Sequence, residues 1–233
     1  NFKSFYKTIK KYKHIKLDAL SVHIGSQILS DVPYKKMLNV MSNLIRELQL
    51  DLKFLDLGGG FGISYNKKDK PIDLKKYSES VYKLAKKLKC KIIFEPGRSI
   101  IGDTGVLLSK IQYIKKGVKK DFVIIDAGMN DFMRPALYDA VHKIIPTKKS
   151  SSKLKGVIEF VGPICESTCK FGSYKNYQKM NENDFVAITN VGAYGSSLSS
   201  NYNSRPLIAE LLVNKNKLKY IRKKQDLLKL INS

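Results

Sequence analysis

The sequence is poor in cysteine and in long hydrophobic runs, and each shortage excludes a class of protein. Only three cysteines occur among 233 residues (Cys90, Cys165 and Cys169), which excludes a disulfide-stapled scaffold. No apolar run approaches the roughly 20 residues of a membrane span, and the Lys-rich first residues lack the apolar core of a signal peptide. We therefore expect a reducing, cytoplasmic compartment.

Arginine is scarce as well, although the chain is strongly basic. The formal net charge is +23, from 43 Lys+Arg against 20 Asp+Glu, and so high a charge raises the possibility of nucleic-acid binding. Specific recognition of phosphates and base edges favours arginine, whose planar fork makes paired hydrogen bonds. Only five of the basic residues are arginine and the lysines are scattered, so we expect no specific nucleic-acid partner.

The composition and the first residues indicate a globular protein with more than one part. With 43% hydrophobic residues the chain can form a core, and its length fits one large or two modest domains. The amphipathic stretch from Phe2 to Ile9 predicts a helix that begins at once, without an initiating methionine. We expect this chain to be the carboxy-terminal part of a longer protein.

Strands and helices alternate in the first hundred residues. Short apolar runs predict strands at Leu17–Val22, Phe54–Leu57 and Ile92–Phe94. Between them, apolar stripes at helical spacing predict two helices, one capped by Asp31 and one opened by Asp73. Strand, helix, strand, helix, strand predicts parallel pairing with right-handed crossovers.

After about Ser99 the pattern changes to short strands separated by turns. Apolar runs bounded by Gly, Asn, Asp or Pro predict strands at Val106–Ile114, Phe122–Ile125, Val157–Val161, Phe185–Ile188 and Ile208–Val213. We expect residues 101–233 to form a mainly antiparallel β domain, with a loop at Pro146–Lys155. The tail from Leu218 to Ile231 is predicted to be a short basic helix.

Unusual residues follow each of the three predicted parallel strands. The clusters His23-Ile24-Gly25-Ser26-Gln27, Gly58-Gly59-Gly60-Phe61-Gly62 and Glu95-Pro96-Gly97-Arg98 recur every 35–37 residues, which is one βα unit. They should therefore meet at one edge of the sheet. The carboxyl ends of parallel strands are where α/β folds and barrels bind ligands.

Each cluster also has an ordinary structural interpretation. The glycine run lacks the pattern of a Walker loop or a dinucleotide fingerprint, and it is either a tight turn or an anion-binding nest. Glu95 could form a structural ion pair with Arg98, and His23 could be a satisfied, half-buried imidazole. The occurrence of all these groups at one sheet edge favours a functional site.

The second half contributes further polar clusters. Asp126–Tyr138, Gly162–Ser167 and Gly192–Gly195 are turns rich in reactive side chains, and Cys165 beside Glu166 suits proton transfer. Cys165 and Cys169 are four residues apart and histidine is rare, so we expect no metal site. Arg98, Arg134 and Arg205 lie in or beside these clusters, which suggests recognition of a carboxylate or a phosphate.

Taken together, the strings HIGSQ, LDLGGGFGI, EPGRS, DAGMNDFMRPALYDA, GPICES and GAYGSS resemble the diaminopimelate decarboxylase family. The resemblance runs over essentially the whole chain in the family's order. It implies a fold in which residues 1–100 are the last three units of a (β/α)8 barrel of the TIM type and residues 101–233 are a C-terminal β domain. It also implies the reaction, which is the decarboxylation of meso-2,6-diaminopimelate to L-lysine in lysine biosynthesis.

The resemblance implies pyridoxal 5'-phosphate (PLP) as cofactor and assigns roles to residues in the first hundred. His23 would stack on the pyridine ring. Gly58, Gly59 and Gly60 would lie at the phosphate. Glu95 would pair with the pyridinium nitrogen, which lets the ring accept electrons from the substrate. The cofactor contacts would be completed by Pro96, Gly97, Arg98 and Tyr194.

The resemblance likewise implies the substrate contacts and a homodimer. Arg98, Arg134 and Tyr138 would bind the substrate, with Tyr194 touching substrate and cofactor. Glu166 would bind the distal ammonium and Cys165 would be the acid that protonates the carbanion. Both reach the partner's active site in this family, so the active site would be shared between two subunits.

Two features depart from the family pattern. No segment of this chain matches the strand that carries the family's cofactor-binding lysine, so we expect the chain alone to be inactive. Cys169 stands where an acidic residue is usual. Two alternatives remain open: another basic amino-acid decarboxylase of the same fold, acting on ornithine, arginine or carboxynorspermidine, and a truncated, non-catalytic homologue.

Overall fold

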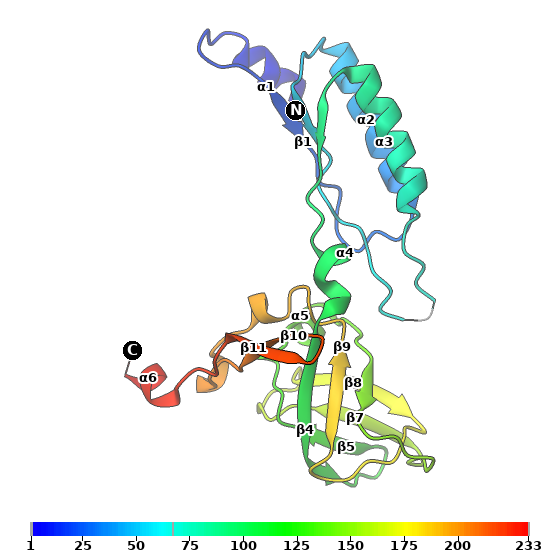
Figure 1. Ribbon diagram of the computed structural model, residues 1–233, viewed down its shortest axis with the longest axis vertical. Coiled ribbons are helices and arrows are strands. Elements are labelled where there is room, and N and C mark those ends of the chain that lie inside the picture. Colours follow the sequence, from blue (N-terminus) through cyan, green and yellow to red (C-terminus); the bar gives the residue numbers. More distant parts are fainter. Residues whose placement is uncertain (1, 67, 233) are drawn as a thin grey trace. The chain divides into compact units, whose positions relative to one another are not determined.

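The computed structural model describes residues 2–66 and 68–232. The chain divides into two compact units, Asn1–Ile100 and Ile101–Ser233, and each is described by itself. Figure 1 shows the order of the elements within each unit.

The first unit is built on a short parallel sheet covered by two helices (Figure 1). Its strands pair in the order β1 (Ala19–Ser21), β2 (Phe54–Asp56), β3 (Lys91–Ile93), both pairs parallel. Along the chain, the helix α2 (Asp31–Glu47) connects β1 to β2, and α3 (Leu74–Leu88) connects β2 to β3. The two helices pack against each other. The predicted order of strand, helix, strand, helix, strand with parallel pairing is therefore confirmed, as is the amino-terminal helix, α1 (Phe2–Ile9).

The helix boundaries follow from their caps. Ser30, and not the expected Asp31, caps α2, because its side-chain oxygen accepts from the N–H of Val32. Asp73 caps α3 as predicted and accepts from Lys75 and Lys76. The apolar faces of both helices join the strand residues in one core, which includes Tyr34, Met37, Leu38, Met41, Leu55, Leu57, Phe61, Tyr77, Val81 and Leu84.

The second unit contains a six-stranded sheet. Its strand order is β6 (Ile144–Pro146), β9 (Phe185–Thr189), β4 (Val106–Lys115), β5 (Asp121–Ile125), β7 (Val157–Val161), β8 (Lys170–Lys175). All neighbours are antiparallel except β5 and β7, which pair in parallel, so the sheet is mixed. Completely buried residues such as Ile111, Val123, Ile158 and Phe160 form its core.

The predicted tail helix is wrong over its first residues. Lys217–Arg222 is a strand, β11, which pairs with β10 (Glu210–Asn214) as an antiparallel hairpin. The alternation of lysine with Leu218 and Tyr220 has the period of two that suits a strand. Only α6 (Leu227–Ile231) is helical, and it begins at the capping residue Asp226.

Two short helices contain predicted site residues. The helix α4 (Arg98–Ile101) begins at Arg98 in the first unit, and α5 (Arg134–Tyr138) lies in the second. None of the helices in the described part of the chain is both long and apolar enough to cross a membrane.

Candidate active site

The register of the three parallel strands brings the predicted residues to one edge. Ser21 pairs with Asp56, and Asp56 pairs with Ile93. Two residues further along, backbone hydrogen bonding still links the segments, since the N–H of Glu95 donates to the carbonyl of Gly58 at 2.8 Å. His23, Gly58 and Glu95 therefore follow their strands at equal distance, as their spacing in the sequence predicts.

The glycine turn after β2 is packed so closely that side chains are excluded. Gly58 and Gly60 have left-handed φ angles of 65° and 88°, which glycine adopts without strain. A Cβ atom at Gly59 would lie 2.9 Å from the carbonyl carbon of Glu95 and closer still to its oxygen. At Gly58 it would lie 2.8 Å from Nδ1 of His23. The glycines thus let three loops approach one another.

His23 lies against this turn, with its ring exposed. Its Nδ1 accepts a hydrogen bond from the N–H of Gly59 at 3.3 Å. A neutral imidazole that accepts at Nδ1 carries its proton at Nε2, so the contact selects one tautomer. It also occupies one amide of the glycine turn, and a second, that of Gly58, donates to Asp56 at 2.9 Å. In residues 2–66 and 68–232, no acceptor is found for the N–H of Gly60, which is half-buried.

The segment after β3 carries two charged residues, Glu95 and Arg98, which differ in exposure. Glu95, Pro96 and Gly97 are exposed, whereas Arg98 is half-buried at the start of α4. The guanidinium of Arg98 donates to the hydroxyls of Tyr65 and, at 3.2 Å, Ser26. Arg98 is thereby fixed beside the first cluster, while the carboxylate of Glu95 faces solvent.

A buried tyrosine is hydrogen-bonded to the glycine turn. The hydroxyl of Tyr34, on α2, donates to the carbonyl of Gly59 at 3.0 Å. Its ring contacts those of Phe61 and Tyr77 at centroid distances of 5.2 and 4.9 Å. Burial raises the pKa of Tyr34 to about 12, so it stays a donor. In the sequence, Tyr34 is distinguished from a core residue only by its hydroxyl, because it lies on the same helical stripe as Met37, Leu38 and Met41.

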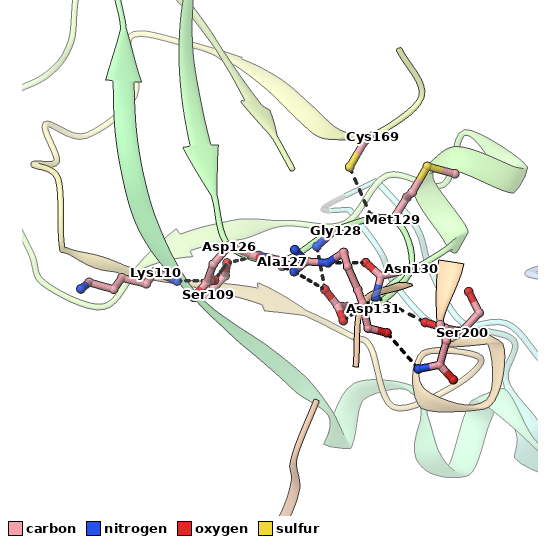
Figure 2. Close-up of polar contacts among 12 residues, drawn as sticks. Ser109, Lys110, Asp126, Ala127, Gly128, Met129, Asn130, Asp131, Cys169 and Ser200 are labelled. Atoms are coloured by element: carbon pink, nitrogen blue, oxygen red, sulfur yellow. Dashed lines mark hydrogen bonds and ion pairs between the residues drawn. The ribbon is translucent and has the colours of Figure 1, made fainter. Parts of the chain in front are cut away.

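In the second unit, the loop after β5 is organised by buried polar contacts (Figure 2). The carboxylate of Asp131 accepts from the N–H of Gly128 at 2.8 Å and from the side chain of Asn130 at 3.0 Å. Arg205 donates to Asn130 at 3.0 Å and to the carbonyl of Asp126 at 2.8 Å, and it lies 3.6 Å from Asp131. Burial raises the pKa of Asp131, which these contacts offset in part.

The hydrogen bonds of Asp131, Asn130 and Arg205 lie just before the segment that carries two predicted substrate contacts. Arg134 is buried and begins α5, whereas Tyr138, the last residue of α5, is 63% exposed. Arg205 was predicted to lie in or beside the polar clusters, but its partners Asn130 and Asp131 were not predicted. An aspartate three residues after a turn glycine, as Asp131 is after Gly128, does not by itself predict a buried carboxylate.

The loop after β7 contains one exposed and one buried cysteine. Cys165 and Glu166 are exposed, and Glu166 accepts a hydrogen bond from the hydroxyl of Tyr202 at 2.8 Å. Cys169 is buried, and its sulfur accepts from the N–H of Met129 at 3.3 Å. Its place in the core explains why an apolar thiol, rather than a charged residue, suits this position.

The last predicted residue, Tyr194, lies on a tight turn. It is a non-glycine residue with a left-handed φ of 57°, and its side chain is 45% exposed. Among the described residues no group of three or more His, Cys, Asp or Glu side chains is placed to hold a metal ion.

The chain is similar to a known family of proteins. A family model described as "Pyridoxal-dependent decarboxylase, C-terminal sheet domain" matches residues 17–192. The diaminopimelate decarboxylase of Aquifex aeolicus is 38% identical over 224 residues, which are 95% of this chain and 53% of that protein. The chain therefore spans about half the length of this curated relative.

Solved structures give the same result. The crystal structure of Helicobacter pylori diaminopimelate decarboxylase complexed with L-lysine superposes with a TM-score of 0.87 at 38% identity, covering 98% of this chain and 57% of that one. The M. jannaschii enzyme with L-lysine gives a TM-score of 0.88 at 32% identity, covering 99% and 54%. Since the family model matches more than half of the 233 residues, the chain belongs to the family of pyridoxal-dependent decarboxylases with this C-terminal sheet domain.

Proposed function

We propose that the protein containing this chain is a cytoplasmic enzyme that decarboxylates meso-2,6-diaminopimelate to L-lysine with PLP. The observation that carries the proposal is the common register of His23, Gly58 and Glu95 at the end of a parallel sheet. The names of the relatives and the L-lysine in two of the similar structures point to the same substrate. We further propose that the first unit is the last part of a (β/α)8 barrel.

The residues at the sheet edge suit this cofactor. The turn at Gly58, Gly59 and Gly60 excludes side chains and leaves the N–H of Gly60 to donate to a phosphate. Pro96, Gly97, Arg98 and Tyr194 would complete the cofactor contacts. When bound, PLP supplies an electron sink for the carbanion left by departing carbon dioxide. None of the lysines in this chain is proposed as the residue that binds the cofactor covalently.

His23 and Glu95 would act on the cofactor ring in different ways. The hydrogen bond from Gly59 orients the imidazole, whose exposed ring offers a flat surface for stacking. Glu95 supplies a negative charge that favours a protonated ring nitrogen. Its backbone N–H is bound to Gly58, so the position of the carboxylate is tied to the glycine turn.

Apart from Arg98, which belongs to the first unit, the substrate contacts would come from the second unit. Arg98 and Arg134 would hold carboxylates of the substrate, with Tyr138 and Tyr194 beside them. Cys165 would hold the proton that is delivered to the substrate carbon. Glu166 would bind the distal ammonium, and in a homodimer both Cys165 and Glu166 would serve the active site of the partner subunit.

An assay of the complete gene product tests this function. We expect release of carbon dioxide and formation of L-lysine from meso-diaminopimelate, with at least a hundredfold preference over ornithine and arginine. Cys165→Ala should lower kcat about a hundredfold with little change in KM, as expected for loss of a positioned acid. Turnover of ornithine or arginine instead of diaminopimelate would favour the other decarboxylases, and no turnover of any of them would favour a non-catalytic homologue.

A further inference from the structure

We propose that Tyr202 is a positioning residue that holds the carboxylate of Glu166 in place for the distal ammonium of the substrate. The proposal rests on the proposed function for the role of Glu166. Tyr202 was not among the residues that the sequence singled out, and it reaches Glu166 across 36 positions of the chain.

The contact restricts a side chain that would otherwise be mobile. The hydroxyl of Tyr202 donates to Oε2 of Glu166 at 2.8 Å, and both side chains are exposed. The backbone of Glu166 is already fixed, since its N–H donates to Ile164 at 2.7 Å and its carbonyl accepts from Cys169 at 3.0 Å. A bond to one carboxylate oxygen leaves Oε1 to accept from an ammonium group. Glu166 also raises the pKa of Tyr202, through the hydrogen bond first and its charge second, so the phenol remains a donor.

The turn that presents Tyr202 is strained. Asn203 and Ser204, which follow it directly, both have left-handed φ angles, 60° and 54°. Asparagine tolerates this region, but serine adopts it at a cost. Two consecutive residues of this kind show that the surrounding structure imposes the shape of the turn, which is a feature of segments that present functional groups.

Polar anchors on both sides of the turn supply that constraint. Asn201 donates to the carbonyl of Arg205 at 2.8 Å and to the side chain of Gln225 at 2.6 Å. Arg205 in turn binds Asn130 and the carbonyl of Asp126. Tyr202 therefore lies between two residues, Asn201 and Arg205, that are each hydrogen-bonded to other segments of the chain.

Kinetics of the complete gene product test the proposal. Tyr202→Phe should raise KM for meso-diaminopimelate about fivefold and leave kcat within about twofold, because the ammonium is remote from the reacting carbon. Tyr113→Phe, an exposed tyrosine on β4, is the matched control and should change neither. In a Glu166→Gln background Tyr202→Phe should have no further effect on KM, since the carboxylate that Tyr202 is proposed to position for the ammonium is already lost. An unchanged KM, or a rise that persists in Glu166→Gln, would overturn the proposal.

A second measurement does not depend on turnover. With ¹³C-labelled tyrosine, NMR titration should show the pKa of Tyr202 falling towards its ordinary value in Glu166→Gln. A Tyr202 pKa that does not respond to Glu166→Gln would overturn the proposal even if the enzyme is active. If the wild-type protein does not act on diaminopimelate, the proposed function fails by itself, and this titration alone decides whether Tyr202 holds Glu166.

Discussion

The two units place their candidate residues by different means. In the first, three segments leave adjacent parallel strands in register, and close contacts of the glycine turn with His23 and with Glu95 set the geometry. In the second, the geometry is set by long-range hydrogen bonds from side chains to loops, among which those of Arg205 and Asp131 are central. The first site should therefore be sensitive to added volume, and the second to the loss of a polar group.

The largest expected effect is that of Gly59→Ala. The added Cβ would overlap the carbonyl group of Glu95, so the two loops must separate and the binding of PLP should weaken at least a hundredfold. Gly156→Ala is the control, because nothing lies within 4 Å of its Cβ and only the strain of its φ of 84° remains. We expect that control to cost about 1 kcal/mol of stability and to bind PLP normally. Absorbance titration of the complete gene product with PLP measures the affinity of each variant. Equal affinities of Gly59→Ala and Gly156→Ala for PLP would contradict the account.

The next effect is that of Arg205→Met in the second unit. Removing the guanidinium leaves Asp131 buried without its cation, which should cost about 3 kcal/mol. Hydrogen exchange of the backbone around Gly128 and Asn130 should report this loss. Arg46→Met, an exposed arginine on α2, should leave the exchange unchanged.

The effect of Arg205→Met should also depend on pH. Burial raises the pKa of Asp131 in the folded state, and Arg205 lowers it in part. A carboxyl whose folded pKa lies above its unfolded value binds more protons when folded, so stability falls as the pH rises through that interval. Without Arg205 the pKa rises further. The variant should therefore lose more stability relative to wild type at pH 7 than at pH 4, and a loss independent of pH would show that the charge of Asp131 is not involved.

A smaller effect is expected from Tyr34→Phe in the first unit. The substitution keeps the aromatic contacts but leaves the carbonyl of Gly59 without its donor, which should cost about 1–2 kcal/mol. Tyr82→Phe, which alters an exposed ring on α3, serves as control. Exchange rates around Gly59 should rise in the first variant only. If the two variants behave alike, the buried phenol does not support the turn.

The sequence predicts the first site better than the second for a physical reason. Parallel strands joined by helices return to the same edge, so a spacing of 35–37 residues is enough to bring three clusters together. The hydrogen bonds of Arg205 to Asn130 and Asp126 cross 75 and 79 residues, and no local pattern encodes contacts of that separation. The pairing of Tyr202 with Glu166 was missed for the same cause.

The prediction of secondary structure failed where the apolar residues fit both the helical period of 3.6 and the strand period of 2. The tail from Leu218 contains apolar residues that fit both a helix and a strand, and the pairing of β11 with β10 decides in favour of the strand. Similarly, β5 and β7 pair in parallel within a region of antiparallel strands. That pairing depends on which strands become neighbours in the sheet, and the apolar runs alone do not specify it.

The most direct test of the account is the protonation state of the PLP ring nitrogen when PLP is bound. With ¹⁵N-labelled PLP in the complete gene product, NMR should show a protonated nitrogen in the wild type and a loss of that proton in Glu95→Gln, with PLP still bound in both. A ring nitrogen whose signal is the same in the two proteins would contradict the claim that the ends of β1, β2 and β3 form one cofactor site.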